Sequence, residues 1–171
     1  MSLFQRIFGE TKQRAPLQPL YAAVVAKGRE PAWYRDGRVP DTLDGRFDMI
    51  AAVLSLVLLR LEQEGEGGKG PSVLLTEIFI EDMDGTLRQL GVGDYVVGKH
   101  VGRMMSALGG RLAAFRAGRA EGSLAGAVTR NIFHEAPPSD EAIAFVAGGL
   151  ERFAAALDAV AVDAVLAGEL P

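Results

Sequence analysis

The 171-residue sequence contains no cysteine and only two histidines. Without cysteine, the chain can form no disulfide, thiolate nucleophile, iron–sulfur cluster or thiolate zinc site, and its composition is compatible with a reducing cytosol. His100 and His134 lie far apart, and neither has a ligand pattern nearby, so metal binding and histidine-based catalysis have little support. We therefore expect neither a metal nor any other cofactor.

Long hydrophobic runs and targeting segments are also lacking. The longest apolar run, residues 49–59, is about half of the roughly 20 residues that a helix needs to cross a bilayer, and Arg60 ends it. Residues 1–8 have neither the apolar stretch nor the cleavage site of a signal peptide. These absences predict a cytoplasmic protein.

Positive charge is in the minority and unevenly spread along the chain. The formal net charge is −4, which argues against a sequence-specific nucleic-acid partner. Residues 99–119 nevertheless carry five Lys or Arg and no acid, whereas residues 120–171 carry eight acids and two Arg. A basic central patch is thus offset by an acidic C-terminal part.

Helical periodicity dominates the chain, and no segment alternates with the period of a strand. Residues 47–63 are apolar almost all round the helical wheel, which is typical of a central helix. We predict an all-α fold: a single compact domain of about six or seven helices around helix 47–63. A flexible N-terminal segment, 1–16, would precede a single domain, 17–171. Further helices are expected over 17–27, 71–90, 94–117, 124–133 and, as acidic C-terminal helices, within 138–168.

The run from Val39 to Met49 joins a turn, several charges and the start of the central helix. Pro40 favours an extended loop, after which Asp41, Thr42 and Asp44 can each cap the free amides of the helix. Arg46 gains nothing from the helix dipole in the first turn and needs an anionic partner of its own.

The helix predicted from Pro71 to Leu90 supplies candidates for that partner. Asp82 lies at the margin of the apolar face, where an unpaired carboxylate is costly, so we expect it to pair with Arg46 or Arg130. Asp84 and Arg88 are four residues apart and can pair with each other. The predicted structural charged network consists of Asp41, Asp44, Arg46, Asp82, Asp84, Arg88 and Arg130.

The helix predicted over 94–117 has one face of small residues, opposite a core stripe that includes Met105, Leu108 and Phe115. Small residues spaced four apart allow another helix to approach closely. Either a helix of the same domain fills this groove, or a partner helix binds it. The aromatic pair Trp33 and Tyr34 likewise either covers a core edge or anchors a partner. The candidate partner-binding residues are Trp33, Tyr34, Lys99, Gly102, Arg103, Ser106, Ala113 and Arg116.

Motifs for catalysis are incomplete. Residues 93–100 have the spacing of a phosphate-binding P-loop, but His100 stands where Ser or Thr should be and no buried strand precedes them. Asp82 and Asp84 lack the remaining ligands of a calcium loop. No serine lies in a nucleophile elbow. We expect no enzymatic activity and no nucleotide binding.

Several segments, taken in order, resemble the ubiquinol-cytochrome c chaperone family over roughly Leu20 to Phe133. They are Pro31 and Tyr34, then 39–49, Asp82 to Asp84, Leu87 and Arg88, 91–94, Val97, Lys99, and Arg130 with Asn131. Val53 stands where the family often has a histidine, so no role of that histidine transfers. The part beyond Phe133 matches the family poorly.

This resemblance implies a non-catalytic chaperone that binds newly made cytochrome b during assembly of the ubiquinol-cytochrome c reductase complex. The Ala- and Gly-rich composition suggests a bacterial member, acting in the cytoplasm or peripherally at the inner membrane. Its expected partner is nascent or newly inserted cytochrome b, with the ribosome or the membrane surface as further contacts. The alternative function is a ribosome- or membrane-surface adaptor that binds phosphates through the basic helix 99–116 without recognising a client.

Overall fold

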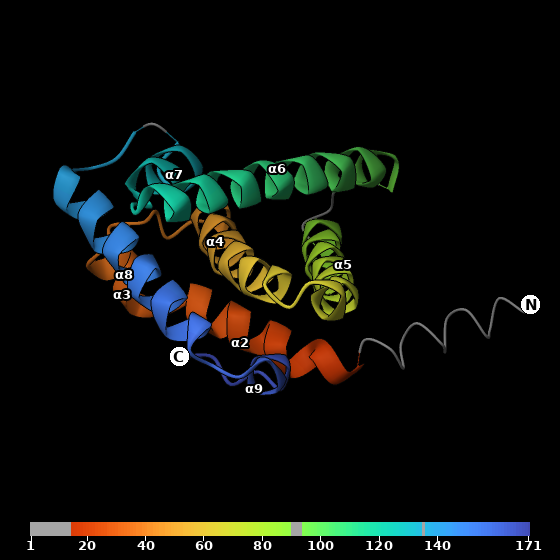
Figure 1. Ribbon diagram of the computed structural model, residues 1–171. Coiled ribbons are helices and arrows are strands. Elements are labelled where there is room, and N and C mark those ends of the chain that lie inside the picture. The colour runs from red at the N-terminus through yellow and green to blue at the C-terminus, as the bar shows by residue number, and fades with distance from the viewer. Residues whose placement is uncertain (1–14, 90–93, 135) are drawn as a thin grey trace, which may run out of the picture.

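The structure, a computed structural model, describes residues 15–89, 94–134 and 136–171, with the side chains of 16–86, 105–134 and 136–171. Within these ranges every regular element is helical, and the others surround α4, as Figure 1 shows. The all-α prediction is confirmed. The elements are η1 (Ala15–Leu17), α2 (Gln18–Gly28), α3 (Pro31–Arg35), α4 (Leu43–Glu62), α5 (Glu66–Gln89), α6 (Asp94–Glu121), α7 (Ala125–Asn131), α8 (Asp140–Asp158) and α9 (Val162–Leu166).

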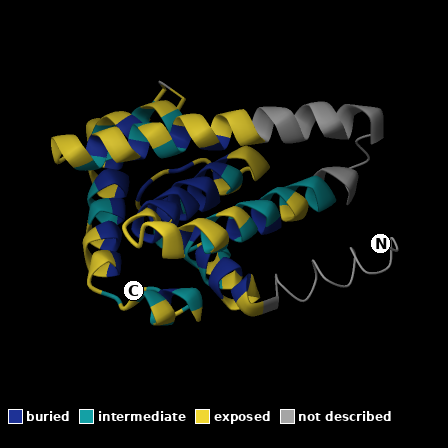
Figure 2. Ribbon diagram, turned by 45° about the vertical axis from the view of Figure 1, so that its right-hand side comes forward, coloured by how far each residue is buried: buried dark blue, intermediate teal, exposed yellow. Residues whose placement is uncertain are grey.

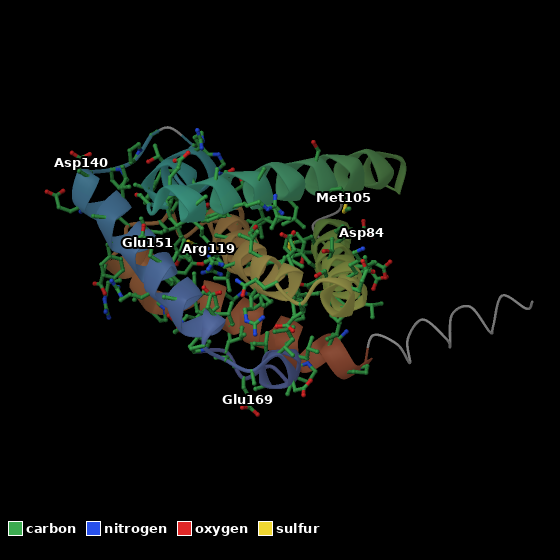
Figure 3. All side chains as sticks on the ribbon, viewed as in Figure 1. Asp84, Met105, Arg119, Asp140, Glu151 and Glu169 are labelled. Atoms are coloured by element: carbon green, nitrogen blue, oxygen red, sulfur yellow. The ribbon has the colours of Figure 1, made fainter. Side chains whose placement is uncertain are left out.

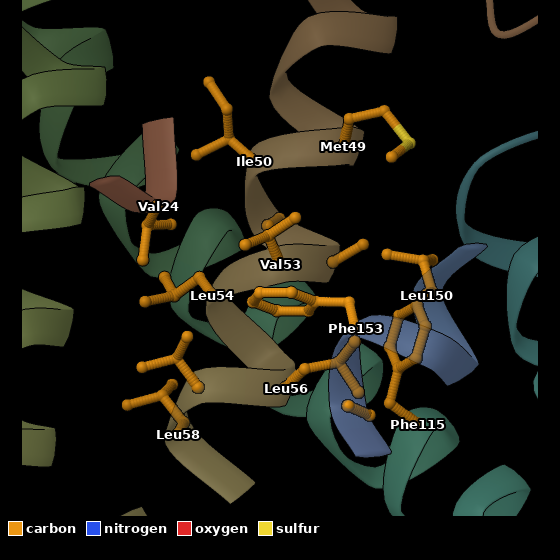
Figure 4. Packing of buried hydrophobic residues seen from close by; sticks show 14 of the residues in the cluster. Val24, Met49, Ile50, Val53, Leu54, Leu56, Leu58, Phe115, Leu150 and Phe153 are labelled. Carbon is orange, nitrogen blue, oxygen red and sulfur yellow. The ribbon is translucent and has the colours of Figure 1, made fainter. Parts of the chain in front are cut away.

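Helix α4 is the centre of the fold, as its apolar composition predicts. Thr42 caps its start by accepting a 3.1 Å hydrogen bond from the amide of Gly45. Residues 48–61 of α4 are all buried, which Figure 2 shows as a continuous dark blue helix. Side chains of α2, α6 and α8, including Val24, Phe115 and Leu150, pack around it in Figure 4. Burial of this helix on all sides supplies most of the apolar core.

Helix α3 lies between the helices predicted over 17–27 and 47–63, in a range where no helix was predicted. Pro31 occupies its first turn, where the missing amide hydrogen costs nothing. Trp33 of this helix is buried against α8, where a Cβ on Gly149 would come within 2.6 Å of the indole ring. Only a glycine allows so close an approach, so α8 and α3 are held together at this point.

The start of α5 corrects the prediction that Pro71 opens this helix after a flexible connector. The helix begins at Glu66, and Pro71 lies inside it. A Cβ on Gly68 would lie 1.9 Å from the carbonyl oxygen of Leu61 at the end of α4. The glycines of residues 65–70 thus permit a tight turn between two helices, which outweighs their low helix propensity.

One face of α6 is open among the described residues, which corrects the prediction for Met105 and argues against one of the two alternatives for the small-residue groove. Met105, expected in the core stripe, is 46 % exposed, and Ser106 and Ala113 are also exposed. A Cβ on Gly109 would meet nothing within 4 Å, so none of the helices that the structure describes fills the small-residue groove there. Leu108 and Phe115 do face the core, as predicted. Figure 3 shows Met105 on the half of α6 that lies above α5, away from Arg119.

The C-terminal part forms two helices, α8 and α9. Ser139 caps α8 by accepting a 3.2 Å hydrogen bond from the amide of Ala142. Val146, Leu150 and Phe153 recur on the face that packs against the core. Across the described ranges, no helix has the length and apolarity needed to span a membrane.

Candidate functional site

A pocket of about 590 Å³ lies between the end of α2, helix α3 and the first turn of α4. Three arginines, one tyrosine, one proline and one aspartate line it: Arg29, Pro31, Tyr34, Arg35, Asp41 and Arg46. We call these six residues the arginine pocket. Tyr34, Asp41 and Arg46 belong to the segments that carry the sequence resemblance, so residues predicted to matter do come together here.

Two of the three guanidinium groups have carboxylate partners. Arg46 Nε donates to Asp41 Oδ1 at 2.6 Å. Arg35 binds Asp36 through two bonds, Nε to Oδ1 at 2.9 Å and Nη2 to Oδ2 at 2.7 Å. These contacts lower the pKa of both aspartates below their usual range. Among the described side chains, Arg29 is exposed and forms no ion pair.

Tyr34 forms the inner wall of the arginine pocket. Its hydroxyl donates a 2.7 Å hydrogen bond to the carbonyl oxygen of Gly28, which ties α3 to the end of α2. Burial raises the pKa of the Tyr34 hydroxyl, and the nearby charges of Arg46, Asp41 and Arg29 act on it as well. All three charges are therefore close to one phenol ring.

Asp82 does not pair with Arg46, so the predicted ion pair between these two residues is wrong. The Asp82 carboxylate accepts a 2.7 Å hydrogen bond from the Tyr21 hydroxyl in α2, while Arg46 binds Asp41. The reason is proximity: Asp41 lies two residues before α4, and only five residues of sequence separate it from Arg46 in the first turn. Arg130, the other predicted partner, is exposed and has no ion pair with Asp82 among the described contacts.

A second polar cluster is buried beside α4. Asp48 is 2 % exposed, and its carboxylate pairs with Arg111 of α6 through Oδ1 and with His134 Nε2 through Oδ2 at 2.7 Å. The Arg111 guanidinium also lies over the ring of Phe47, 5.1 Å from its centroid. Burial raises the pKa of Asp48 even though Arg111 and His134 act in the opposite direction. These contacts join α4 to α6 and to the segment after α7.

Sequence reasoning missed Arg29, Arg35, Tyr21 and the partners of Asp48. Arg111 lies 63 residues from Asp48, and His134 lies 86 residues away, so no local pattern links them. One signal was available: a carboxylate inside an almost wholly apolar helix requires a buried cation. Arg111, between Leu108 and Leu112 on the core side of α6, meets that requirement.

The remaining predicted residues have varied positions. Trp33 is buried, and its indole nitrogen donates to the carbonyl oxygen of Lys27 at 2.8 Å, so it covers the core. Asp44 is exposed, and Asp84 is half-buried with interactions of its own.

Arg116 binds both carboxylate oxygens of Glu62, at 2.7 and 2.9 Å. Arg88, Lys99, Gly102 and Arg103 lie outside the described side chains.

The geometry favours binding of an anionic group over metal binding. The residues that the structure describes contain no group of three potential metal ligands. The arginine pocket, by contrast, presents planar guanidinium groups, which match carboxylate and phosphate oxygens. Residues 93–100, whose spacing matches a P-loop only in part, lie outside the described side chains.

Comparisons with known proteins agree with this architecture. The family model described as ubiquinol-cytochrome C chaperone matches residues 35–170. The crystal structure of the Cbp3 homologue from Brucella abortus is similar, with a TM-score of 0.80 and 26 % sequence identity over 99 % of this chain and 95 % of that chain. No curated protein matches the chain in sequence.

The matched range corrects the extent of the predicted resemblance. The family match begins at residue 35 rather than at Leu20, and it continues through α8 and α9 to residue 170. The C-terminal helices, expected to match poorly, are therefore part of the family pattern. A chaperone role in ubiquinol-cytochrome c reductase assembly is supported by both comparisons. The chain belongs to the ubiquinol-cytochrome c chaperone family.

Proposed function

We propose that this chain binds newly made cytochrome b and holds it during assembly of the ubiquinol-cytochrome c reductase complex. The observation that carries the proposal is the family match over residues 35–170. The similarity to the Brucella abortus Cbp3 homologue, which extends over nearly the whole of both chains, supports the same role.

Two described surfaces suit a polypeptide partner. The open face of α6 presents Ser106, Gly109 and Ala113 to solvent, with the exposed Met105 beside them. The arginine pocket offers charged and aromatic contacts on a separate set of elements. Exposed apolar and small residues accept a client helix, whereas guanidinium groups accept its polar or acidic ends. A client could thus be held at more than one point.

The adaptor alternative receives less support from the described part of α6. Its cations there have acidic partners: Arg111 pairs with Asp48, Arg116 with Glu62, and Arg119 with Asp158. Cations that are already neutralised contribute little to phosphate binding. An adaptor without a client would therefore have to rely on Lys99 and Arg103.

A gene deletion tests the proposed function. In the deletion strain we expect less assembled ubiquinol-cytochrome c reductase and normal levels of the other respiratory complexes, measured by native electrophoresis and haem b spectra of membranes. Expression of the wild-type chain from a plasmid should restore the complex. Normal amounts of assembled reductase in the deletion strain would contradict the proposal.

A further inference from the structure

The arginine pocket contains one arginine that no ion pair of the described side chains neutralises. Arg35 and Arg46 are paired with Asp36 and Asp41, but Arg29 has no acidic partner among the described side chains. Three guanidinium groups line the pocket, and two of them have a carboxylate bound to them. The third, that of Arg29, lies beside a cavity of about 590 Å³, which has room for more than a single ion.

The internal ion pairs show which ligand geometry the arginine pocket accepts. Arg35 holds a carboxylate with two in-plane bonds, and Arg46 holds one through Nε. Both pairs are largely exposed, with Arg46 53 % and Asp41 58 % exposed, so solvent screens them and little free energy is needed to separate them. Arg29 and Arg46 line the same pocket, so a carboxylate that takes the place of Asp41 on Arg46 enters the space that Arg29 also borders.

We propose that the arginine pocket binds a carboxylate of an acidic polypeptide segment, which displaces Asp41 from Arg46 and pairs with Arg29. This inference rests on the proposed function, because the segment would belong to the client. Pro31 and Tyr34 form the apolar side of the pocket, against which the aliphatic part of a glutamate side chain packs.

An acidic peptide fits better than the surface of an anionic membrane. Glu30, Asp36 and Asp44 each lie within two residues of a lining arginine. A broad anionic surface would meet these acids together with the arginines, and like charges would repel it. A narrow peptide can place its carboxylate on Arg29 and Arg46 and avoid the acids.

The sharpest test is to remove the carboxylate of Asp41, which competes with the peptide for Arg46. Asp41→Asn leaves the Arg46 guanidinium without its carboxylate, so it should tighten binding of an acidic peptide. Glu62→Gln is a matched control, because it frees Arg116, which is 52 % exposed, in the same way on a different face. Arg29→Gln and Arg46→Gln remove the proposed contacts. All four positions are exposed, so circular dichroism should show an unchanged fold.

The probe is a short peptide of alternating glutamate and alanine that carries a neutral dye, followed by fluorescence anisotropy. We expect its Kd to rise about threefold with Arg29→Gln or Arg46→Gln, the usual loss for one solvent-exposed ion pair. Asp41→Asn should lower the Kd about threefold or more, and Glu62→Gln should leave it unchanged. A peptide with glutamine in place of glutamate should not bind.

Two results would overturn the inference. One is equal peptide affinity for all variants. The other is binding of phosphatidylglycerol vesicles that is lost with Arg29→Gln and Arg46→Gln while the peptide does not bind, which would assign the arginine pocket to lipid. Either result leaves the deletion experiment unaffected, so a wild-type chain that restores the reductase would preserve the proposed function without this inference.

Discussion

The Tyr21 hydroxyl of α2 donates a 2.7 Å hydrogen bond to the Asp82 carboxylate of α5, across 61 residues of sequence. Tyr21 is 7 % exposed, and burial and Asp82 together raise the pKa of its phenol, while Arg29 acts in the opposite direction. The same arginine acts on Tyr34 in the arginine pocket. The Tyr21–Asp82 hydrogen bond therefore joins α2 to α5.

Tyr21→Phe should lower the free energy of unfolding by about 1 kcal/mol, the net value of one hydrogen bond, because the ring stays in place and only the hydroxyl is lost. Urea unfolding followed by circular dichroism measures this. A free energy of unfolding equal to that of the wild type would show that the bond to Asp82 contributes nothing.

The raised pKa of Tyr21 also predicts a loss of stability at alkaline pH. The folded chain keeps the phenol proton above the ordinary pKa of 10.0, whereas the unfolded chain releases it. The contribution of Tyr21 is therefore complete below pH 10 and decreases as the pH rises further. The difference in unfolding free energy between wild type and Tyr21→Phe should shrink above this pH, and a difference that stays constant would contradict the assignment.

Asp48→Asn should lower the free energy of unfolding by about 3 kcal/mol, because it leaves the buried Arg111 without a counter-charge. Chemical denaturation measures the loss. The double variant Asp48→Leu with Arg111→Met removes both charges. Its loss of unfolding free energy should be smaller than the summed losses of the single variants Asp48→Leu and Arg111→Met. Additive losses would mean that the two side chains do not act as a pair.

Asp48 should titrate above 3.8, its ordinary pKa, because burial outweighs the effects of Arg111 and His134. In the folded chain it binds its proton more tightly than in the unfolded chain. The contribution of this group to stability thus falls as the pH rises from 3.8 through the raised pKa and is constant above it. NMR of the Asp48 carboxyl carbon checks this, and a pKa at or below 3.8 would contradict it.

Gly45→Ala should destabilise the start of α4. An added Cβ would lie 2.0 Å from the carbonyl oxygen of Pro40, so the loop would have to move, at a cost of about 1–3 kcal/mol. Gly109→Ala is the control, because nothing lies within 4 Å of its Cβ position and alanine favours the helix. Thermal unfolding should therefore give a lower Tm for the first variant only. Equal Tm values would mean that the loop adapts freely.

The central helix could be predicted from sequence because its apolar signal is local. Its start was predicted only roughly: α4 begins at Leu43, four residues before the predicted range 47–63, and Thr42 was one of three candidate caps. The beginning of α5 could not be predicted in this way, because Pro71 and the glycines before it are typical of a connector. Their helical conformation depends on close packing of Gly68 against Leu61, which is a tertiary contact.

The candidate site was predictable only in part, for the same reason. Arg46 clearly needed an acid, but its choice of Asp41 over Asp82 depends on the path of the loop. No sequence pattern near Arg29 indicates that it lines a pocket, because the pocket forms only where α2, α3 and α4 come together. Likewise, the exposure of Met105 could not be inferred from a periodic stripe that continues into the core.

The most direct test of the central claim is capture of pulse-labelled cytochrome b with an affinity-tagged copy of this chain. The wild-type chain should retain newly made cytochrome b soon after synthesis and lose it as the reductase assembles. The variant with both Arg29→Gln and Arg46→Gln should retain less, and the Glu62→Gln control should retain as much as the wild type. Recovery of no more cytochrome b than with an untagged strain would contradict the claim that this chain holds the subunit during assembly.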